Sequence, residues 1–176
     1  MIEEVISSLT HGGTSNKPGL SSIAAVPVEG VSLPGLFALF QQTTPDFETT
    51  VTQASITLNA GYSWLDVAND FSHLMTLSEA QKNNSPHGPS YIYTVTQEIP
   101  GDANSSGHLL RSWSRHEWVL VTTSTDGTIR LIGGINGHGA KLRTTFSSGS
   151  QSNGPSKNSL ELVWECTERA PYLLAS

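Results

Sequence analysis

Alternation of apolar and polar residues with a period of two dominates this chain. Residues 50–59 place apolar side chains among Thr, Gln and Ser, and residues 91–99 are rich in aromatic and β-branched side chains before a Pro-Gly pair. Such patterns are typical of half-buried β-strands. Shorter strand-like runs are predicted at residues 22–28, 36–42, 142–147 and 160–166.

The clearest local motif is a predicted hairpin in the C-terminal half. Two apolar runs, residues 118–123 and 128–132, flank the pair Asp126-Gly127. Asp-Gly between apolar runs indicates a tight turn, because such turns need the positive φ that glycine adopts easily.

Residues 66–80 fit two descriptions. Val67, Phe71 and Leu74 partly follow helical spacing, whereas Phe71, His73 and Met75 also fit the alternation of a strand. We prefer a strand at 71–80 that pairs with 91–98 across the loop 83–90. A short helix is predicted within 105–115, where Leu109, Leu110 and Trp113 have helical spacing.

Together these elements predict a mostly β protein. Strands separated by turn signals every 8–12 residues or so favour an antiparallel β-sandwich or barrel with about one short helix. Residues 1–19 start with a helix-like stretch at 2–9 and continue with Gly, Ser, Asn and Pro, so we expect a flexible N-terminal arm. Residues 20–176 are expected to form a single β-rich domain.

The composition is unusually poor in charge. Charged residues make up 14% of the chain and hydrophobic residues 36%, and the net charge is −6. A lightly charged surface indicates one that is covered by partners in use. Nine Lys and Arg residues without a basic run argue against sequence-specific nucleic-acid binding.

No motif indicates chemistry. One cysteine, Cys166, allows no intrachain disulfide, and the six histidines lack the spacing of metal ligands. The glycine-rich residues 133–139 lack the ending of a phosphate loop. We therefore expect no catalytic, metal or cofactor-binding residues and no enzyme activity. No apolar run is long enough to cross a membrane and no signal peptide is visible, so folding in a reducing cytoplasm is expected.

Four tryptophans raise an alternative, a β-sandwich module that binds carbohydrate or another ligand. Trp64 and Trp113 lie outside the strand runs, but Trp118 and Trp164 sit within them, where core packing is the simpler interpretation.

A series of short strand and turn motifs is spread over residues 70–175. They are Ser78-Glu-Ala-Gln-Lys, His87-Gly88, Ile99-Pro100-Gly101, Glu117-Trp-Val-Leu-Val, Asp126-Gly127, Arg130-Leu-Ile-Gly133, Phe146-Ser-Ser-Gly149, Leu160-Glu-Leu-Val-Trp and Arg169-Ala-Pro-Tyr172. In these motifs the chain resembles small tail structural proteins of Bacteroides-type phages and prophages.

The resemblance implies a tail-tube-like virion subunit that forms stacked homo-oligomeric rings around a DNA-conducting lumen. Its partners would be further copies of itself and other virion tail proteins, assembled in the host bacterial cytoplasm. No catalytic residue carries over. The long polar segment 10–34 departs from the pattern, so a neck, terminator or adaptor protein stays an alternative.

Rings of β-rich subunits can be built by pairing edge strands of neighbours into a shared sheet. The strand 91–98 and the hairpin 118–132 are the predicted contacts. The candidate contact residues are Tyr91, Tyr93, Val95, Trp118, Leu120, Ile129 and Leu131. Ring symmetry and the surface that faces the lumen stay open.

Overall fold

The computed structural model describes residues 19–41, 51–66, 75–82, 88–100, 113–135, 137–147, 157–167 and 169–174. The strands in these ranges are β1 (Leu20–Pro27), β2 (Leu65–Asp66), β3 (Met75–Lys82), β4 (Ser90–Pro100), β5 (Glu117–Ser124), β6 (Ile129–Ile132), β7 (Ala140–Ser147), β8 (Lys157–Cys166) and β9 (Tyr172–Leu173). The helical elements are α2 (Leu33–Gln41) and two 3-10 turns, η1 (Val28–Gly30) and η2 (Gln53–Ser55).

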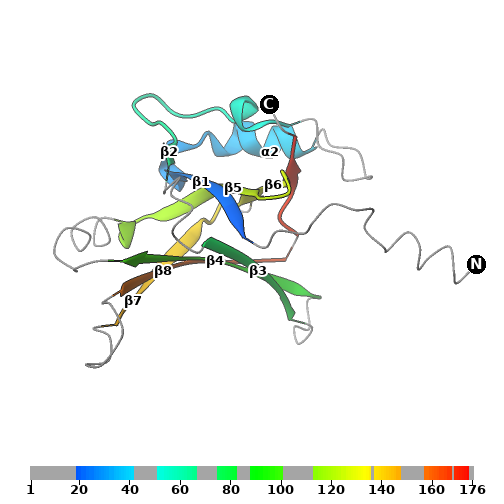
Figure 1. The fold of residues 1–176 in the computed structure, drawn as a ribbon. Coiled ribbons are helices and arrows are strands. Elements are labelled where there is room, and N and C mark those ends of the chain that lie inside the picture. The colour runs from blue at the N-terminus through cyan, green and yellow to red at the C-terminus, as the bar shows by residue number, and fades with distance from the viewer. Residues whose placement is uncertain are drawn as a thin grey trace, which may run out of the picture.

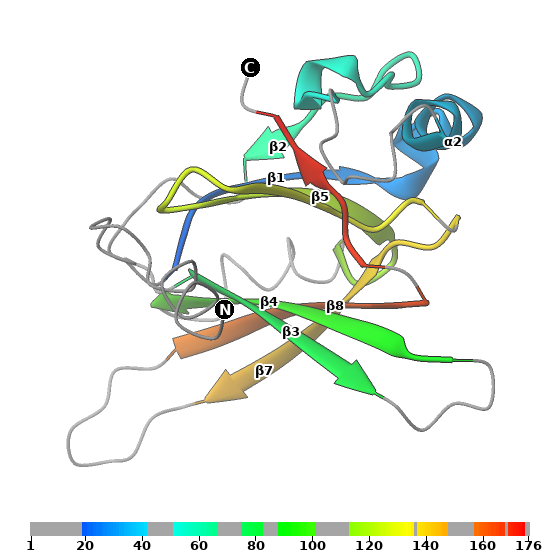
Figure 2. The ribbon, with the colours of Figure 1, turned by 90° about the vertical axis from the view of Figure 1, so that its right-hand side faces the viewer.

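The strands form one open antiparallel sheet that bends into two layers (Figure 1). Its main path runs β2-β1-β5-β7-β8-β4-β3, and β6 with β9 branches from β5. The upper layer contains β1, β5 and β6, and α2 lies above it; the lower layer contains β7, β8, β4 and β3 (Figure 2). The expected mostly β antiparallel fold is confirmed, and among the described residues it carries one α-helix, α2.

Strand β5 is the centre of the molecule because both of its faces are buried. Trp118 and Leu120 belong to the core between the two sheet layers, whereas Val119 and Val121 pack in a second core beneath α2. A strand buried on both faces reads as a continuous apolar run, which explains the sequence of residues 118–121.

The predicted pairing of the strand at 71–80 with 91–98 is confirmed where the structure describes it. Strand β3 pairs antiparallel with β4, with Leu77 opposite Val95; residues 71–74 lie outside the described ranges. The predicted hairpin is also confirmed, since Leu120 on β5 is opposite Ile132 on β6, and Gly127 in the turn has a φ of 87°.

The predicted strand at 36–42 is wrong where the structure describes it, because residues 36–41 belong to helix α2; residue 42 lies outside the described ranges. Pro34 and Gly35, which come directly before the predicted strand, lie in the first turn of this helix. Proline is tolerated in the first turn of a helix, where its missing N–H has no intrahelical partner. The uniformly apolar run that follows does not by itself distinguish a buried helix from a strand.

The predicted strand at 50–59 is also wrong over its described residues, 51–59. This segment contains η2, and two isolated bridges, Val31 with Leu58 and Thr52 with Leu174, are its β pairings among the described residues. The side chains of Thr52 and Ser55 cap the turn reciprocally. Such local side-chain hydrogen bonds compete with a sheet ladder, which alternation alone cannot reveal.

The remaining strand predictions agree with the structure. The runs at 22–28, 142–147 and 160–166 correspond to β1, β7 and β8. The predicted arm before Gly19, the predicted helix before Trp113 and most of the loop 83–90 lie outside the described residues. The division into an arm and a single domain stays a prediction.

Candidate functional site

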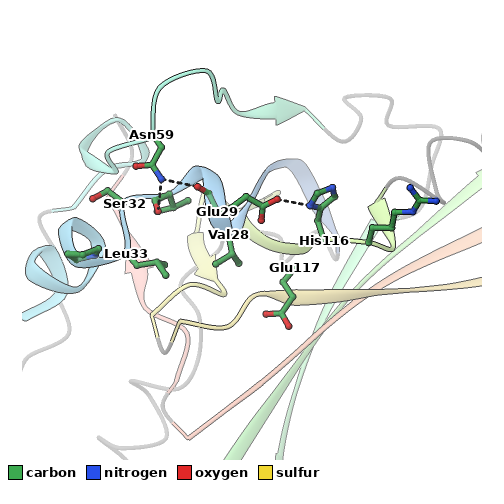
Figure 3. A pocket seen from close by; sticks show the side chains of 10 residues that line it. Val28, Glu29, Ser32, Leu33, Asn59, His116 and Glu117 are labelled. Atoms are coloured by element: carbon green, nitrogen blue, oxygen red, sulfur yellow. Dashed lines mark hydrogen bonds and ion pairs between the residues drawn. The ribbon is translucent and has the colours of Figure 1, made fainter.

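A cleft of about 650 Å³ opens below η1 and the first turn of α2 (Figure 3). It is lined by Val28, Glu29, Val31, Ser32, Leu33, Pro34, Asn59, Arg115, His116 and Glu117. Segments far apart in the sequence meet there, because the start of β5 runs beneath η1.

The closest polar contact in this cleft joins an imidazole to a carboxylate. His116 Nδ1 lies 2.6 Å from Glu29 Oε1, and both side chains are more than 40% exposed. Asn59 fixes η1 by donating from Nδ2 to the backbone oxygen of Glu29 at 2.8 Å. A carboxylate-oriented imidazole is part of a hydrolytic triad. Within the described part of the chain, the hydrogen-bond partner of this imidazole is the Glu29 carboxylate.

Glu117 points away from that pair (Figure 3) and serves the fold. Its Oε2 accepts a hydrogen bond from the Gly139 N–H at 2.9 Å, and Lys141 Nζ lies 3.3 Å from Oε1. The Gly139 hydrogen bond, followed by Lys141, holds the pKa of this carboxyl below its ordinary value. Glu117 therefore anchors the point where β7 joins β5.

A second cleft, of about 680 Å³, lies between the layers where β3 faces β6 and β9. Glu79 on β3 is its central charge: Arg130 Nη1 donates to Oε2 at 2.8 Å and Arg169 Nε donates to Oε1 at 3.1 Å. Arg130 also donates to the Tyr172 hydroxyl at 2.6 Å. Each oxygen of this carboxylate accepts a hydrogen bond from an arginine of the same chain, and the Arg130 contact joins the two layers across the cleft.

The described side chains offer no metal centre. No group of three or more His, Cys, Asp or Glu residues gathers within the described ranges. Within the same ranges no helix is long and apolar enough to cross a membrane.

The tryptophans give little support to a carbohydrate platform. Trp113, Trp118 and Trp164 are buried, and Trp64 is half-buried. Trp113 and Trp118 stack with ring centres 4.1 Å apart, and the Trp118 indole N–H donates to the Trp113 carbonyl. Aromatic platforms for sugars need exposed rings, which these three residues lack.

Most of the predicted subunit-contact side chains lie inside the subunit. Tyr91 and Ile129 are half-buried, and the other five are almost completely buried: Tyr93, Val95, Trp118, Leu120 and Leu131. A side chain in the core cannot also contact a neighbour, so burial removes these five from the candidate contacts. Strands β4 and β5 are also paired on both sides, which corrects their assignment as edges.

In the lower layer the unpaired edges are instead β3 and most of β7. Among the described residues β3 pairs only with β4, and β7 beyond Lys141 pairs only with β8. Residues 78–82 of β3 are exposed. The charged and polar residues Glu79, Gln81 and Lys82 were an available signal, because exposed edge strands commonly carry them.

Comparison of the chain with protein-family models, curated proteins and solved structures returns no match.

Proposed function

We propose that this protein is a structural subunit of a bacteriophage tail that assembles into rings by pairing its sheet edges. The supporting observation is the lower layer β7-β8-β4-β3, whose two outer strands have unpaired edges among the described residues. The sequence resemblance to phage tail proteins supplies the biological setting.

The strand directions of this layer suit a closed ring. Each neighbour pair within it is antiparallel, so β7 and β3 run in opposite directions. When rotation about an axis along the strands places the β7 of one copy beside the β3 of the next, those strands are antiparallel as well. A heterologous interface of this kind closes into a ring and leaves no unpaired edge in this layer.

The layer also has a face suited to a lumen. The upper layer and α2 cover only one of its faces (Figure 2). Met75, Tyr93 and Leu162 are buried on the covered face of this layer, and side chains alternate between the two faces of each strand. The opposite face therefore carries small and β-branched residues, including Ser78, Thr94 and Val163. Charges of both signs accompany them, among them Lys82 paired with Glu165. A wall without a strong positive field would let DNA pass without binding it tightly.

Negative-stain electron microscopy and light scattering over a concentration series test the proposal. Rings or tubes are the expected result. Particles that remain monomers of 18.8 kDa at all concentrations, including when mixed with the other tail proteins, would contradict it.

A cysteine pair tests the interface itself. Ser78 on β3 and Arg143 on β7 are exposed, and within one subunit β4 and β8 separate their strands. Three strand spacings amount to about 14 Å, whereas a disulfide needs Cα atoms less than about 7 Å apart. Oxidation of the Ser78→Cys, Arg143→Cys double variant should therefore give a ladder of covalent oligomers that ends at the ring size.

The two single variants are the controls for that ladder, since each can form at most a dimer through the introduced cysteine. Because the register across the interface is open, Thr76→Cys and Ala80→Cys replace Ser78→Cys in parallel samples. No ladder with any of the three, in material that forms rings, would exclude the β3–β7 interface.

A further inference from the structure

We infer that the apolar stripe of residues 2–9 of one copy docks on the exposed face of helix α2 of a second copy. The inference deepens the proposed self-assembly and rests on it. It names a contact other than the sheet edges, between the N-terminal arm and the layer farthest from β3 and β7.

Helix α2 presents an apolar face that the described residues do not cover. Its nine residues include no charged side chain. Leu36 is fully buried against the upper layer, whereas Phe37 is 52% exposed and Pro34 and Ala38 are also exposed. A helix that is apolar on all sides is usually buried on all sides. The outer face of α2 therefore fits a protein partner.

Further exposed apolar side chains lie on the same side of the upper layer as α2. Tyr62 and Leu174 are 41% and 49% exposed, and both belong to segments above the upper layer, as α2 does (Figure 2). Leu174 is held there by a hydrogen bond of 3.0 Å from its N–H to the Val51 carbonyl.

The chain itself carries a segment of matching chemistry outside the described residues. Ile2, Val5, Ile6 and Leu9 have the i, i+3, i+4, i+7 spacing that forms one apolar stripe on a helix. Glu3 and Glu4 fall in the first turn of such a helix, where acidic side chains are favourable. A helix of two turns is not stable alone in water, so this stripe needs a surface to dock on.

The position of the arm favours the α2 of another copy. Gly19 lies beside the start of β3 and the β5–β6 turn, where its carbonyl accepts a hydrogen bond from the Thr125 N–H at 3.2 Å. Helix α2 follows the opposite end of β1 (Figure 2). The eight residues of β1 span about 26 Å, whereas the polar linker 10–18 has a root-mean-square span of about 15–18 Å.

Gly19, where the arm joins the described chain, and the acceptor face on α2 thus lie at opposite ends of β1. A contact between such surfaces is heterologous and repeats from copy to copy, which is the arrangement that stacking requires. The sheet edges would close each ring, and the arm would join one ring to the next.

Disulfide trapping tests which copy the arm contacts. Full-length Ile6→Cys and Phe37→Cys chains are mixed in equal amounts, oxidised and mapped by mass spectrometry. The expected product is a 6–37 disulfide between two chains, at least tenfold more abundant than the 7–37 product of Ser7→Cys, which lies on the other side of the helix. Equal yields from the two positions, or no interchain product, would overturn the inference.

The double variant Ile6→Cys, Phe37→Cys tests whether the segment 2–9 docks on the α2 of its own copy instead. A 6–37 link that forms within one chain and does not depend on concentration would show docking on the same copy, and would overturn the assignment to a second one.

Ring stacking is then compared between two variants, each of which carries one added charge on a different side of the segment 2–9. Val5→Asp puts a carboxylate into the apolar stripe and should raise the protein concentration required for stacking by about tenfold or more, because burying that charge is costly. Ser7→Asp, with the same charge on the outer side, should change it by less than about twofold. Equal effects of the two variants would exclude the stripe as the contact.

The outcomes separate this inference from the proposed function. Single rings that no longer stack in Val5→Asp support both. Tubes that form normally in Val5→Asp reject the arm contact and leave the rings standing. Chains linked through residues 6 and 37 without any ring in micrographs support the arm contact and reject the tail-ring proposal.

Discussion

The carboxylate of Glu79 on β3 accepts a 2.8 Å hydrogen bond from Arg130 Nη1 on β6, and this contact joins the two layers of the sheet. Both side chains are only 22% exposed. Arg169 contributes a second guanidinium to the same carboxylate. The edge strand proposed for subunit pairing is therefore held against the upper layer by charge as well as by the core.

We expect Glu79→Gln to destabilise the fold by about 1–3 kcal/mol, because it leaves two guanidinium groups without their shared carboxylate. Urea unfolding measures the loss. Glu165→Gln is the matched control, since Glu165 is 57% exposed and lies 3.8 Å from Lys82. Such exposed pairs contribute about 0–1 kcal/mol. Equal losses in both variants would refute the bridging role of Glu79.

Glu117 should make stability depend on pH in the acid range. Its folded-state pKa lies below the ordinary value of 4.5, chiefly because of the Gly139 hydrogen bond. The contribution of the Glu117 carboxylate to the free energy of unfolding is therefore complete above about pH 4.5, and it is lost as the pH falls through the lower folded-state pKa. Unfolding midpoints measured from pH 6 downward should fall less steeply in Glu117→Gln. Parallel curves for the two proteins would contradict this assignment.

Tyr93 should contribute through its hydroxyl as well as its ring. The side chain is fully buried, and Oη accepts a 2.9 Å hydrogen bond from the Ala170 N–H. Burial raises the pKa of this tyrosine. Tyr93→Phe leaves a buried N–H without a partner and should cost about 1–3 kcal/mol in thermal or urea unfolding. Tyr91→Phe, at a half-buried position on the same strand, should change stability by less than half as much.

Two glycine-to-alanine changes should have opposite signs. A Cβ at Gly139 would lie 2.6 Å from the backbone nitrogen of Trp118 and 2.5 Å from Val28 Cγ2, so we expect a loss of about 1–3 kcal/mol. A Cβ at Gly35 in α2 would meet chiefly the Ser32 side chain, which can rotate. The higher helix propensity of alanine should then stabilise the protein by about 0.5–1 kcal/mol. Calorimetry of both variants checks the sign of each stability change. Higher stability in Gly139→Ala would show that the β5–β7 junction is more loosely packed than described.

The sequence by itself determined the strands whose information is local. The Asp126-Gly127 turn fixes the β5–β6 hairpin, and alternation fixes β4 and the inward face of β8, because a strand with one buried face must repeat every second residue. It also determined the antiparallel class. Helix α2 was wrongly predicted as a strand because its apolar run has no period. The segment 50–59 was wrongly predicted as a strand because the side chains of Thr52 and Ser55 form a local cap.

The tertiary structure alone decided which strands are edges. Residues 91–98 and 118–132 were predicted to form subunit contacts, yet β4 and β5 have partners on both sides and most of their predicted contact side chains fill the core. Pairing between distant strands, such as β5 with β1 and β4 with β8, depends on how both cores close. An edge is defined by the absence of a neighbouring strand. Polar residues such as Glu79, Gln81 and Lys82 are a local signal of exposure, but which strands lie side by side depends on the whole fold.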